Sequence, residues 1–192
     1  PVSSLPNGAV IASGGVNGMC LELSFNANSS SINLINTISV SGNNTVIYGS
    51  YPLPSIPNGT NIAISALADY YAVWSINGTS VAVYTSSGKL VGNATMPYGT
   101  YSYVGTMYLI SGNTTYEYFI FSTTTSGTLE YVWVSSNGSI GVNTLSTSLT
   151  FTTSKLIATY ITNGTLYQAM VSGSSVYVIE FTAVAPNTLG FN

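Results

Sequence analysis

Apolar and polar residues alternate with a period of two along most of this chain. The alternation is clear at residues 19–25, 116–120, 129–133 and 177–181. This pattern is typical of β-strands that bury one face. No segment carries the capped stripe of apolar residues, repeating every 3.6 positions, that marks an amphipathic helix. The pattern therefore predicts an all-β chain with essentially no helix.

Turn signals separate the expected strands. Asn-Gly pairs stand at 77–78, 137–138 and 163–164, and three Ser-Gly pairs stand at 87–88, 111–112 and 172–173. Asn-Gly favours a tight hairpin with a type I′ turn, in which both central residues have positive φ. We expect roughly a dozen strands joined mostly by antiparallel turns, a pattern typical of a β-sandwich or barrel.

The first 18 residues differ from the rest. A short extended stretch and a small apolar run at 9–12 precede Gly14, Gly15 and Gly18. We divide the chain into a leading strand with a glycine-rich hinge, 1–18, and a body, 19–192. The leading strand either pairs within its own sheet or is donated to a neighbouring subunit by strand addition. The start at Pro1, without Met, is expected to be a processed N-terminus.

Charge is almost missing. The 192 residues include two Lys, five acidic residues and no His, so 4% are charged, while 45% are hydrophobic. Two lysines cannot form the basic stripe that nucleic acid requires or a polybasic membrane patch. Centres based on His are excluded, and no apolar run is long enough for a membrane-spanning helix. The apolar content predicts a folded domain, not a disordered one.

So few titrating groups make the surface nearly independent of pH, because stability changes with pH only through groups whose proton uptake changes on folding. A cytosolic protein has no need of this composition, whereas a protein facing acid outside the cell does. Strand edges without lysines are poorly protected against pairing with another chain. That is a hazard in a monomer and an advantage in a protein that polymerises.

Acid–base chemistry has few candidates. Glu22, Glu117, Glu130 and Glu180 all fall within expected strands, and we interpret them as part of a polar outer face. A glycosidase would need two carboxyls about 5–9 Å apart, and the sequence does not show which pairs are adjacent. No G-x-S-x-G or S-x-x-K motif occurs, and Asp69 stands alone, too little for a calcium site. We expect no enzyme activity, metal or cofactor.

Three other side chains were considered for covalent chemistry. Lys89 or Lys155 could form an isopeptide bond with an Asn, although a surface lysine is the simpler interpretation. Cys20 has no second cysteine with which to form an internal disulfide, and we interpret it as a small apolar residue of a strand.

Sequons for N-glycosylation are the most frequent motif. Eight asparagines are followed two residues later by Ser or Thr without an intervening Pro: Asn28, Asn43, Asn58, Asn77, Asn93, Asn113, Asn137 and Asn163. All but Asn28 and Asn43 are expected in turns, where a bulky glycan is accessible. We therefore expect covalent surface glycans if the protein is exported.

Together, the leading strand with its glycine hinge, the all-β body, the near-absence of charge and the many sequons resemble the subunit of the archaeal thread, a cell-surface filament of Sulfolobales. The resemblance implies an antiparallel pilin-like or Ig-like β-sandwich with an N-terminal donor strand. It implies an extracellular homopolymer, assembled head to tail by donor-strand complementation, heavily N-glycosylated and active in adhesion or biofilm. Identical subunits would be its partners, with other surfaces or cells as targets. Carried over, the donor strand lies within residues 1–13 and includes Val2, Leu5, Ala9, Val10 and Ile11.

Other functions remain open. The chain could be a secreted carbohydrate-binding or adhesive module, with sugar rings stacked on Tyr70, Tyr71, Trp74, Tyr116, Tyr118 or Trp133. A variant is part of a β-propeller, since hairpins such as 72–85 resemble blade strands and 192 residues suffice for about four blades. Two further alternatives are an envelope protein of the S-layer type and an enzyme with paired carboxylates. Glu117 and Glu130 are the first candidates for such a pair.

Overall fold

The structure is a computed structural model that describes residues 9–14, 19–26, 32–41, 44–51, 60–125, 127–148, 155–172 and 174–192. These residues form sixteen strands and no helix. Every strand pair is antiparallel. The prediction of an all-β, antiparallel chain is confirmed.

The strands form four sheets of four, which we call blades 1 to 4. Blade 1 contains β1 (Ala9–Gly14), β2 (Met19–Asn26), β3 (Ile32–Ser41) and β4 (Asn44–Tyr51). Blade 2 contains β5 (Thr60–Ile64), β6 (Tyr70–Ser75), β7 (Ser80–Thr85) and β8 (Leu90–Thr95). Blade 3 contains β9 (Thr100–Ser111), β10 (Thr114–Thr123), β11 (Thr128–Ser135) and β12 (Ile140–Ser146). Blade 4 contains β13 (Lys155–Thr162), β14 (Thr165–Ser172), β15 (Ser175–Ala185) and β16 (Thr188–Phe191).

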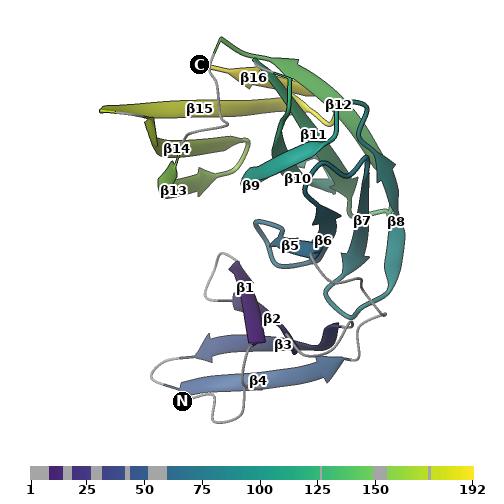
Figure 1. Ribbon diagram of the computed structural model, residues 1–192. Coiled ribbons are helices and arrows are strands. Elements are labelled where there is room, and N and C mark those ends of the chain that lie inside the picture. Colours follow the sequence, from purple (N-terminus) through teal and green to yellow (C-terminus); the bar gives the residue numbers. More distant parts are fainter. Residues whose placement is uncertain are drawn as a thin grey trace.

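The blades follow one another as a fan. In each blade the strands pair in sequence order, so every blade is a simple up-and-down meander. Figure 1 shows the four blades along a C-shaped arc, with the first strand of each on the inner side and the last strand farther out. β1 contacts β5, and β9 contacts β13, β14 and β15, across successive blades. This is the layout of β-propeller blades, one of the alternatives that the sequence left open.

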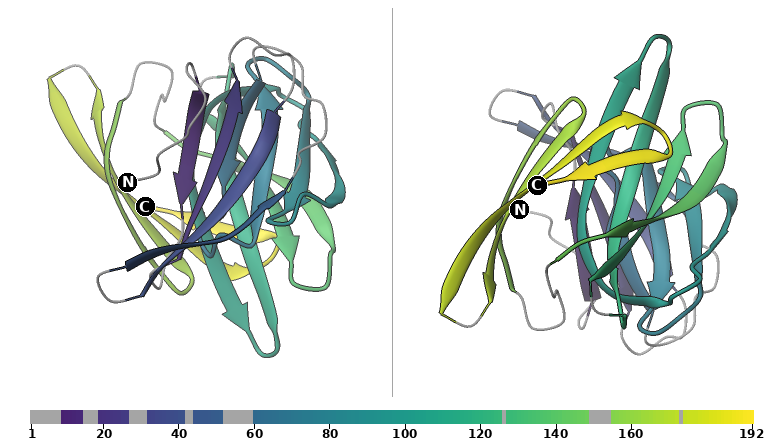
Figure 2. Two further views of the ribbon diagram at one scale, coloured as in Figure 1. Left: turned by 90° about the horizontal axis from the view of Figure 1, so that it is seen from below. Right: turned by 90° about the horizontal axis from the view of Figure 1, so that it is seen from above.

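Blades 2 and 3, and blades 3 and 4, also pack face to face, as the sheets of a sandwich do, but the described strands form four sheets rather than two. The blade faces and both ends of the arc can be followed in Figure 2. The pilin-like or Ig-like type of sandwich that the resemblance implies stays a prediction.

The leading strand is paired within this chain. β1 pairs with β2, with Ala9 opposite Asn26, Val10 opposite Phe25 and Ile11 opposite Ser24. This is the first of the two arrangements left open by the sequence. Donation of the same strand to a neighbouring subunit stays a prediction, and the other two expected donor residues, Val2 and Leu5, lie outside the described residues.

The core lies between the blades. Phe119, Phe121 and Val132 of blade 3 belong to a buried cluster with blade 2. Their neighbours along the strands, such as Tyr118 and Ile120, point the other way and belong to a second cluster with blade 4. Blade 3 is therefore apolar on both faces because both faces are covered, and the strand period of two assigns its residues to one cluster or the other.

The hairpins lie where the sequence predicts them, but their turn type differs. At 137–138 and 163–164 only the glycine has positive φ, and at 77–78 only Asn77 does, whereas a type I′ turn needs both. At β11–β12, the N–H of Gly138 donates to the carbonyl of Ser135 at 2.8 Å. The N–H of Ser135 donates to the carbonyl of Ser139 at 2.9 Å. This is a type I turn closed by a glycine bulge, which an Asn-Gly pair fits equally well.

Candidate functional site

The sequon asparagines that the structure describes are all exposed: Asn77, Asn93, Asn113, Asn137 and Asn163. The other three, Asn28, Asn43 and Asn58, lie outside the described residues. Four of the exposed five occupy hairpin turns, as expected. Asn93 does not, because it lies within β8, the last strand of blade 2.

Three of these turns lie at the same end of the blades. Asn113, Asn137 and Asn163 follow the first or third strand of a blade, and in a meander those connections share one end. Asn163 links two of these turns directly, because its Oδ1 accepts a hydrogen bond from the N–H of Ile110 at 2.8 Å. Asn77 follows a second strand and therefore lies at the opposite end. We call the end with three sequons the sequon end.

Blade 4 has one face that the described part of the chain leaves exposed. Opposed residues of an antiparallel pair point to the same side of a sheet. Tyr160 lies opposite Tyr167, and Tyr167 lies opposite Glu180. Ala169 lies opposite Val178, and Val171 opposite Val176. We call this surface the open face: Tyr160, Tyr167, Ala169, Val171, Val176, Val178 and Glu180.

Apart from Glu180, the open face carries aromatic and aliphatic side chains, and four of them are exposed to solvent. The exposed fraction is 65% for Tyr160 and Val176 and 70% for Val178. The two tyrosine rings pack together with centroids 6.2 Å apart. The opposite face of the same strands carries Leu166 and Phe181, both fully buried against blade 3. One side of blade 4 is thus a core face and the other an uncovered apolar face.

In blade 3, the face that corresponds to the open face is covered by the next blade. Its side toward blade 4 carries Tyr118, Ile120 and Tyr131, all buried. The corresponding side of blade 4 is the open face. The open face is thus the counterpart, in blade 4, of a surface that the next blade covers in blade 3.

Two of the expected outer-face carboxylates are buried instead. Glu117 is 1% exposed and Glu130 is 0% exposed, so the expectation of a polar outer face is wrong for both. They point into the seam between blades 2 and 3, on the same side of blade 3 as Phe119 and Phe121. Glu180 is half-buried on the open face, and the side chain of Glu22 lies outside the described residues.

Each buried carboxylate is held by one backbone amide of blade 2 or its connections. Oε1 of Glu117 accepts a hydrogen bond from the N–H of Leu67 at 2.7 Å. Oε1 of Glu130 accepts one from the N–H of Tyr98 at 3.1 Å. Oε2 of each carboxylate is buried without a hydrogen-bond partner in the described part of the chain. Since an ionised carboxylate is costly to bury when half of it is unpaired, both sites favour the protonated acid.

Burial dominates the pKa values of these acids. It raises the pKa of Glu117 to about 7, and the nearby Asp69 charge adds to the rise, against hydrogen bonds from Leu67 and Ser65. Burial also raises the pKa of Glu130, against the hydrogen bond from Tyr98. The pKa of Asp69 is raised by burial too.

Glu117 and Glu130 do not form a glycosidase pair. Glu130 lies opposite Phe121, four residues along β10 from Glu117. At about 3.4 Å per strand residue, the backbone positions of the two residues are roughly 14 Å apart along the strand. Retaining and inverting glycosidases use spacings of about 5–9.5 Å, so this pair does not fit that chemistry.

The sugar-stacking candidates are mostly core residues. Tyr71 and Tyr118 are fully buried, and Trp74 is 7% exposed. Tyr116 and Trp133 are half-buried and pack edge to face beside the cluster between blades 3 and 4. Tyr70 lines a pocket.

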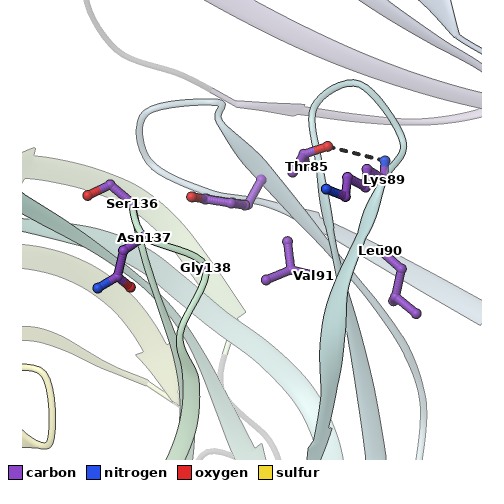
Figure 3. A pocket seen from close by; sticks show the side chains of 8 residues that line it. Thr85, Lys89, Leu90, Val91, Ser136, Asn137 and Gly138 are labelled. Carbon is purple, nitrogen blue, oxygen red and sulfur yellow. Dashed lines mark hydrogen bonds between the residues drawn. The ribbon is translucent and has the colours of Figure 1, made fainter.

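The pocket lies at the sequon end, between the β7–β8 and β11–β12 turns (Figure 3). It has a volume of about 400 Å³ and is lined by Tyr70, Thr85, Lys89, Leu90, Val91, Ser136, Asn137 and Gly138. Lys89 is exposed, so the interpretation of a surface lysine is confirmed for it. The isopeptide bond stays a prediction, and the side chain of Lys155 lies outside the described residues.

The described residues contain no group of three or more His, Cys, Asp or Glu that could hold a metal ion. No described helix is long and apolar enough to cross a membrane.

No family model matches the chain, and no curated protein matches it in sequence. Among solved structures it is similar to Kluyveromyces lactis Hsv2, with a TM-score of 0.55 at 12% identity over 94% of this chain and 60% of Hsv2. This likeness concerns the fold alone, and the chain spans less than two thirds of the length of Hsv2.

Two weaker likenesses have TM-scores below 0.5 and carry no argument. An exo-1,5-alpha-L-arabinanase from a bovine ruminal metagenomic library matches with a TM-score of 0.44 at 10% identity, over 95% of this chain and 76% of the arabinanase. A subtype N11 neuraminidase-like protein of A/flat-faced bat/Peru/033/2010 (H18N11) matches with a TM-score of 0.41 at 12% identity, over 96% of this chain and 51% of its own.

The open face is the feature that the sequence analysis missed. Its signal is the unbroken apolar run 176–179, which precedes Glu180 in β15. A strand that is apolar at successive positions is expected to be covered on both faces. The run 176–179 therefore predicts that another layer covers the second face of blade 4. The described residues do not supply that layer.

Proposed function

We propose that this chain is a structural subunit of an extracellular, glycosylated filament in which identical subunits join head to tail. The open face of blade 4 is the observation that carries the proposal. A contiguous apolar face this exposed is uncommon on a soluble monomer and marks an interaction surface.

The proposed occupant of the open face is blade 1 of a second copy. Within the fan, blade 3 covers a face of blade 2 and blade 4 covers a face of blade 3, each through a buried apolar cluster. Blade 1 has the same strand order as the other blades. A second copy therefore continues the stacking with the same kind of contact. Such a head-to-tail contact propagates a filament when it does not close and gives a ring when it does.

The glycan sites are compatible with this contact. Four of the five described sequons lie in turns at the ends of the blades, and Asn93 lies on the last strand of blade 2. None of these five belongs to the open face. Glycans at these positions would coat the rims of an assembly and leave the stacking faces bare.

The donor strand of the resemblance is a second mode for the same assembly. β1 is an edge strand of blade 1 and carries no charged residue. An edge without charges is poorly protected against exchange between chains. In this mode β1 leaves β2 and pairs with a strand of the neighbouring subunit. Main-chain hydrogen bonds between these two strands then hold the polymer together.

Electron microscopy of three purified chains tests the proposal: the intact chain, a chain lacking residues 1–15, and Val178→Lys. Filaments of the intact chain support it, whereas closed rings would support the head-to-tail contact and contradict the filament. Their loss in Val178→Lys, with the truncated chain still assembling, assigns the contact to the open face. Loss in the truncated chain alone assigns it to the donor strand. Monomers of the intact chain at high concentration would contradict the proposal.

A further inference from the structure

The pocket at the sequon end combines features that the structural role does not use. Its volume of about 400 Å³ falls within the range of roughly 300–1,000 Å³ that is typical of small-molecule sites. Blade 2 and blade 3 each contribute one turn to it, so its shape depends on the buried seam between them. It is therefore a feature of the packed fold, not of one loop.

One wall of the pocket is an aromatic ring in a fixed position. The hydroxyl of Tyr70 donates a hydrogen bond to the carbonyl of Ser135 across the seam, at 3.1 Å. Tyr70 also packs against the cluster between the two blades. Because the ring is held at both ends, it presents a surface to the pocket without a further loss of conformational freedom on binding.

The opposite wall carries a cation. The backbone N–H of Lys89 donates to Oγ1 of Thr85 at 3.2 Å, and the carbonyl of Lys89 accepts from the N–H of Thr85 at 2.8 Å. Figure 3 shows the Lys89 side chain extending from this turn toward the pocket. The chain has two lysines and no other basic side chain, so one of its two cations lines this pocket.

The remaining polar groups are neutral. Thr85 contributes a hydroxyl, which accepts from the N–H of Lys89 and bonds the hydroxyl of Ser87, while Leu90 and Val91 supply apolar surface. The hydroxyl of Ser136 accepts a hydrogen bond from the N–H of Thr115 at 3.2 Å, and Figure 3 shows it turned away from Lys89. Figure 3 shows the Asn137 amide turned away from Lys89 and Val91, so a glycan on Asn137 would extend away from the pocket.

We propose that this pocket binds a sugar residue that carries an acidic group, a uronic acid or a sulfated sugar. Lys89 pairs with the anionic group, the ring of Tyr70 stacks on the apolar face of the sugar, and the hydroxyl of Thr85 binds one of its hydroxyls. An aromatic face, an ammonium group and a neutral hydroxyl are the chemistry that an anionic sugar requires. The site is independent of self-assembly and would act in a monomer or a filament.

Two acidic groups lie on the Tyr70 side of the pocket, and they set the conditions of the test. Asp69 and Glu117 both act electrostatically on Tyr70. When ionised they oppose an anionic ligand. A pH of 5 favours binding, because the sugar carboxylate is ionised while burial holds Glu117 protonated.

The test is an NMR titration of the intact, isotope-labelled chain at pH 5 with D-glucuronate, glucose 6-sulfate and D-glucose. We expect both acidic sugars to shift the resonances of residues 85–91 and 136–138, with D-glucose binding at least tenfold more weakly. Lys89→Met is expected to weaken glucuronate binding about tenfold, the loss of one charge-assisted contact. Lys155→Met is the matched control. It removes the other lysine of the chain, at the start of β13, and is expected to bind glucuronate as the unmodified chain does.

A second variant tests the aromatic contact separately. Tyr70→Leu removes the stacking face and is expected to weaken both acidic sugars, and also the residual binding of D-glucose. Equal affinities for glucuronate and D-glucose would overturn the proposal. So would shifts confined to other parts of the chain, or a Lys89→Met affinity equal to that of Lys155→Met.

Discussion

Gln168 of β14 occupies the space that a side chain on Gly105 of β9 would need. Its Nε2 donates to the carbonyl of Val104 at 2.7 Å, and its Oε1 accepts from Oγ1 of Thr159 at 2.7 Å. A Cβ built on Gly105 would lie 2.1 Å from Nε2 of Gln168 and 2.9 Å from Leu166. The glycine therefore allows blade 4 to approach blade 3 closely enough for a buried amide to join them.

Gly105→Ala is expected to lower the free energy of unfolding by about 1–3 kcal/mol, because it overpacks this contact and displaces the Gln168 hydrogen bond. Gly190→Ala is the matched control. A Cβ there would meet only the carbonyl of Thr182 at 3.6 Å, an ordinary contact. Urea denaturation of both variants measures the difference. Equal stabilities would show that Gly105 is not needed for the contact between the blades.

The buried acid Glu117 should make the protein more stable in mild acid than at neutral pH. Below about pH 4.5 the carboxyl is neutral in both the folded and the unfolded chain. Between about 4.5 and 7 the unfolded chain ionises first, so stability falls as the pH rises through this window. Because burial raises the pKa of Glu117 from 4.5 to about 7, its total contribution to this change is of the order of 3 kcal/mol. Glu130 adds a change of the same sign.

Denaturation midpoints at pH 4.5 and pH 8 measure this effect. Glu117→Gln keeps the acceptor for the N–H of Leu67 and removes the charge, so the pH dependence should become smaller, with the contributions of Glu130 and Asp69 remaining. Glu180→Gln, on the open face, is the control and should leave it in place. A protein that loses stability steadily between pH 8 and pH 4.5 would contradict the placement of Glu117 in the seam.

Glycosylation is expected at the exposed turn of Asn77. Thr79→Ala removes the hydroxyl of the sequon, while Ser80→Ala changes the next exposed residue and leaves the sequon intact. In a host that glycosylates asparagine, intact mass should fall by one glycan in Thr79→Ala only. Loss of a glycan in both variants, or in neither, would mean that this turn is not a glycan site.

The strands and hairpins follow from local rules, and β10 shows why. Tyr116, Tyr118 and Ile120 alternate with Glu117 and Phe119, so the period of two predicts the strand and separates its two faces. The sequence did not show that both faces are covered. For that reason Glu117 was expected outside, although it lies in a seam between blades. Which sheet packs on which face depends on contacts between distant residues, which no local pattern contains.

The open face could not be predicted from the sequence for the same reason. The register of β13, β14 and β15 places Tyr160, Tyr167 and Glu180 in one row. That row is visible only after strand pairing is known, because the three residues come from three separate strands. The alternation at 177–181 predicted part of β15, but no local pattern showed which strands lie beside it. The turns, by contrast, depend on two or three consecutive residues, and their positions were predicted correctly.

Sedimentation velocity of Val178→Lys beside Ile76→Lys tests the self-assembly most directly. Val178 is 70% exposed on the open face, and Ile76 is 58% exposed near the β6–β7 turn, so both changes should leave the fold intact. The unmodified chain and Ile76→Lys are expected to sediment as polymers or closed rings, and Val178→Lys as a monomer, because a buried lysine has no partner in an apolar contact. Identical sedimentation of the two variants would contradict the assignment of the open face as the subunit contact.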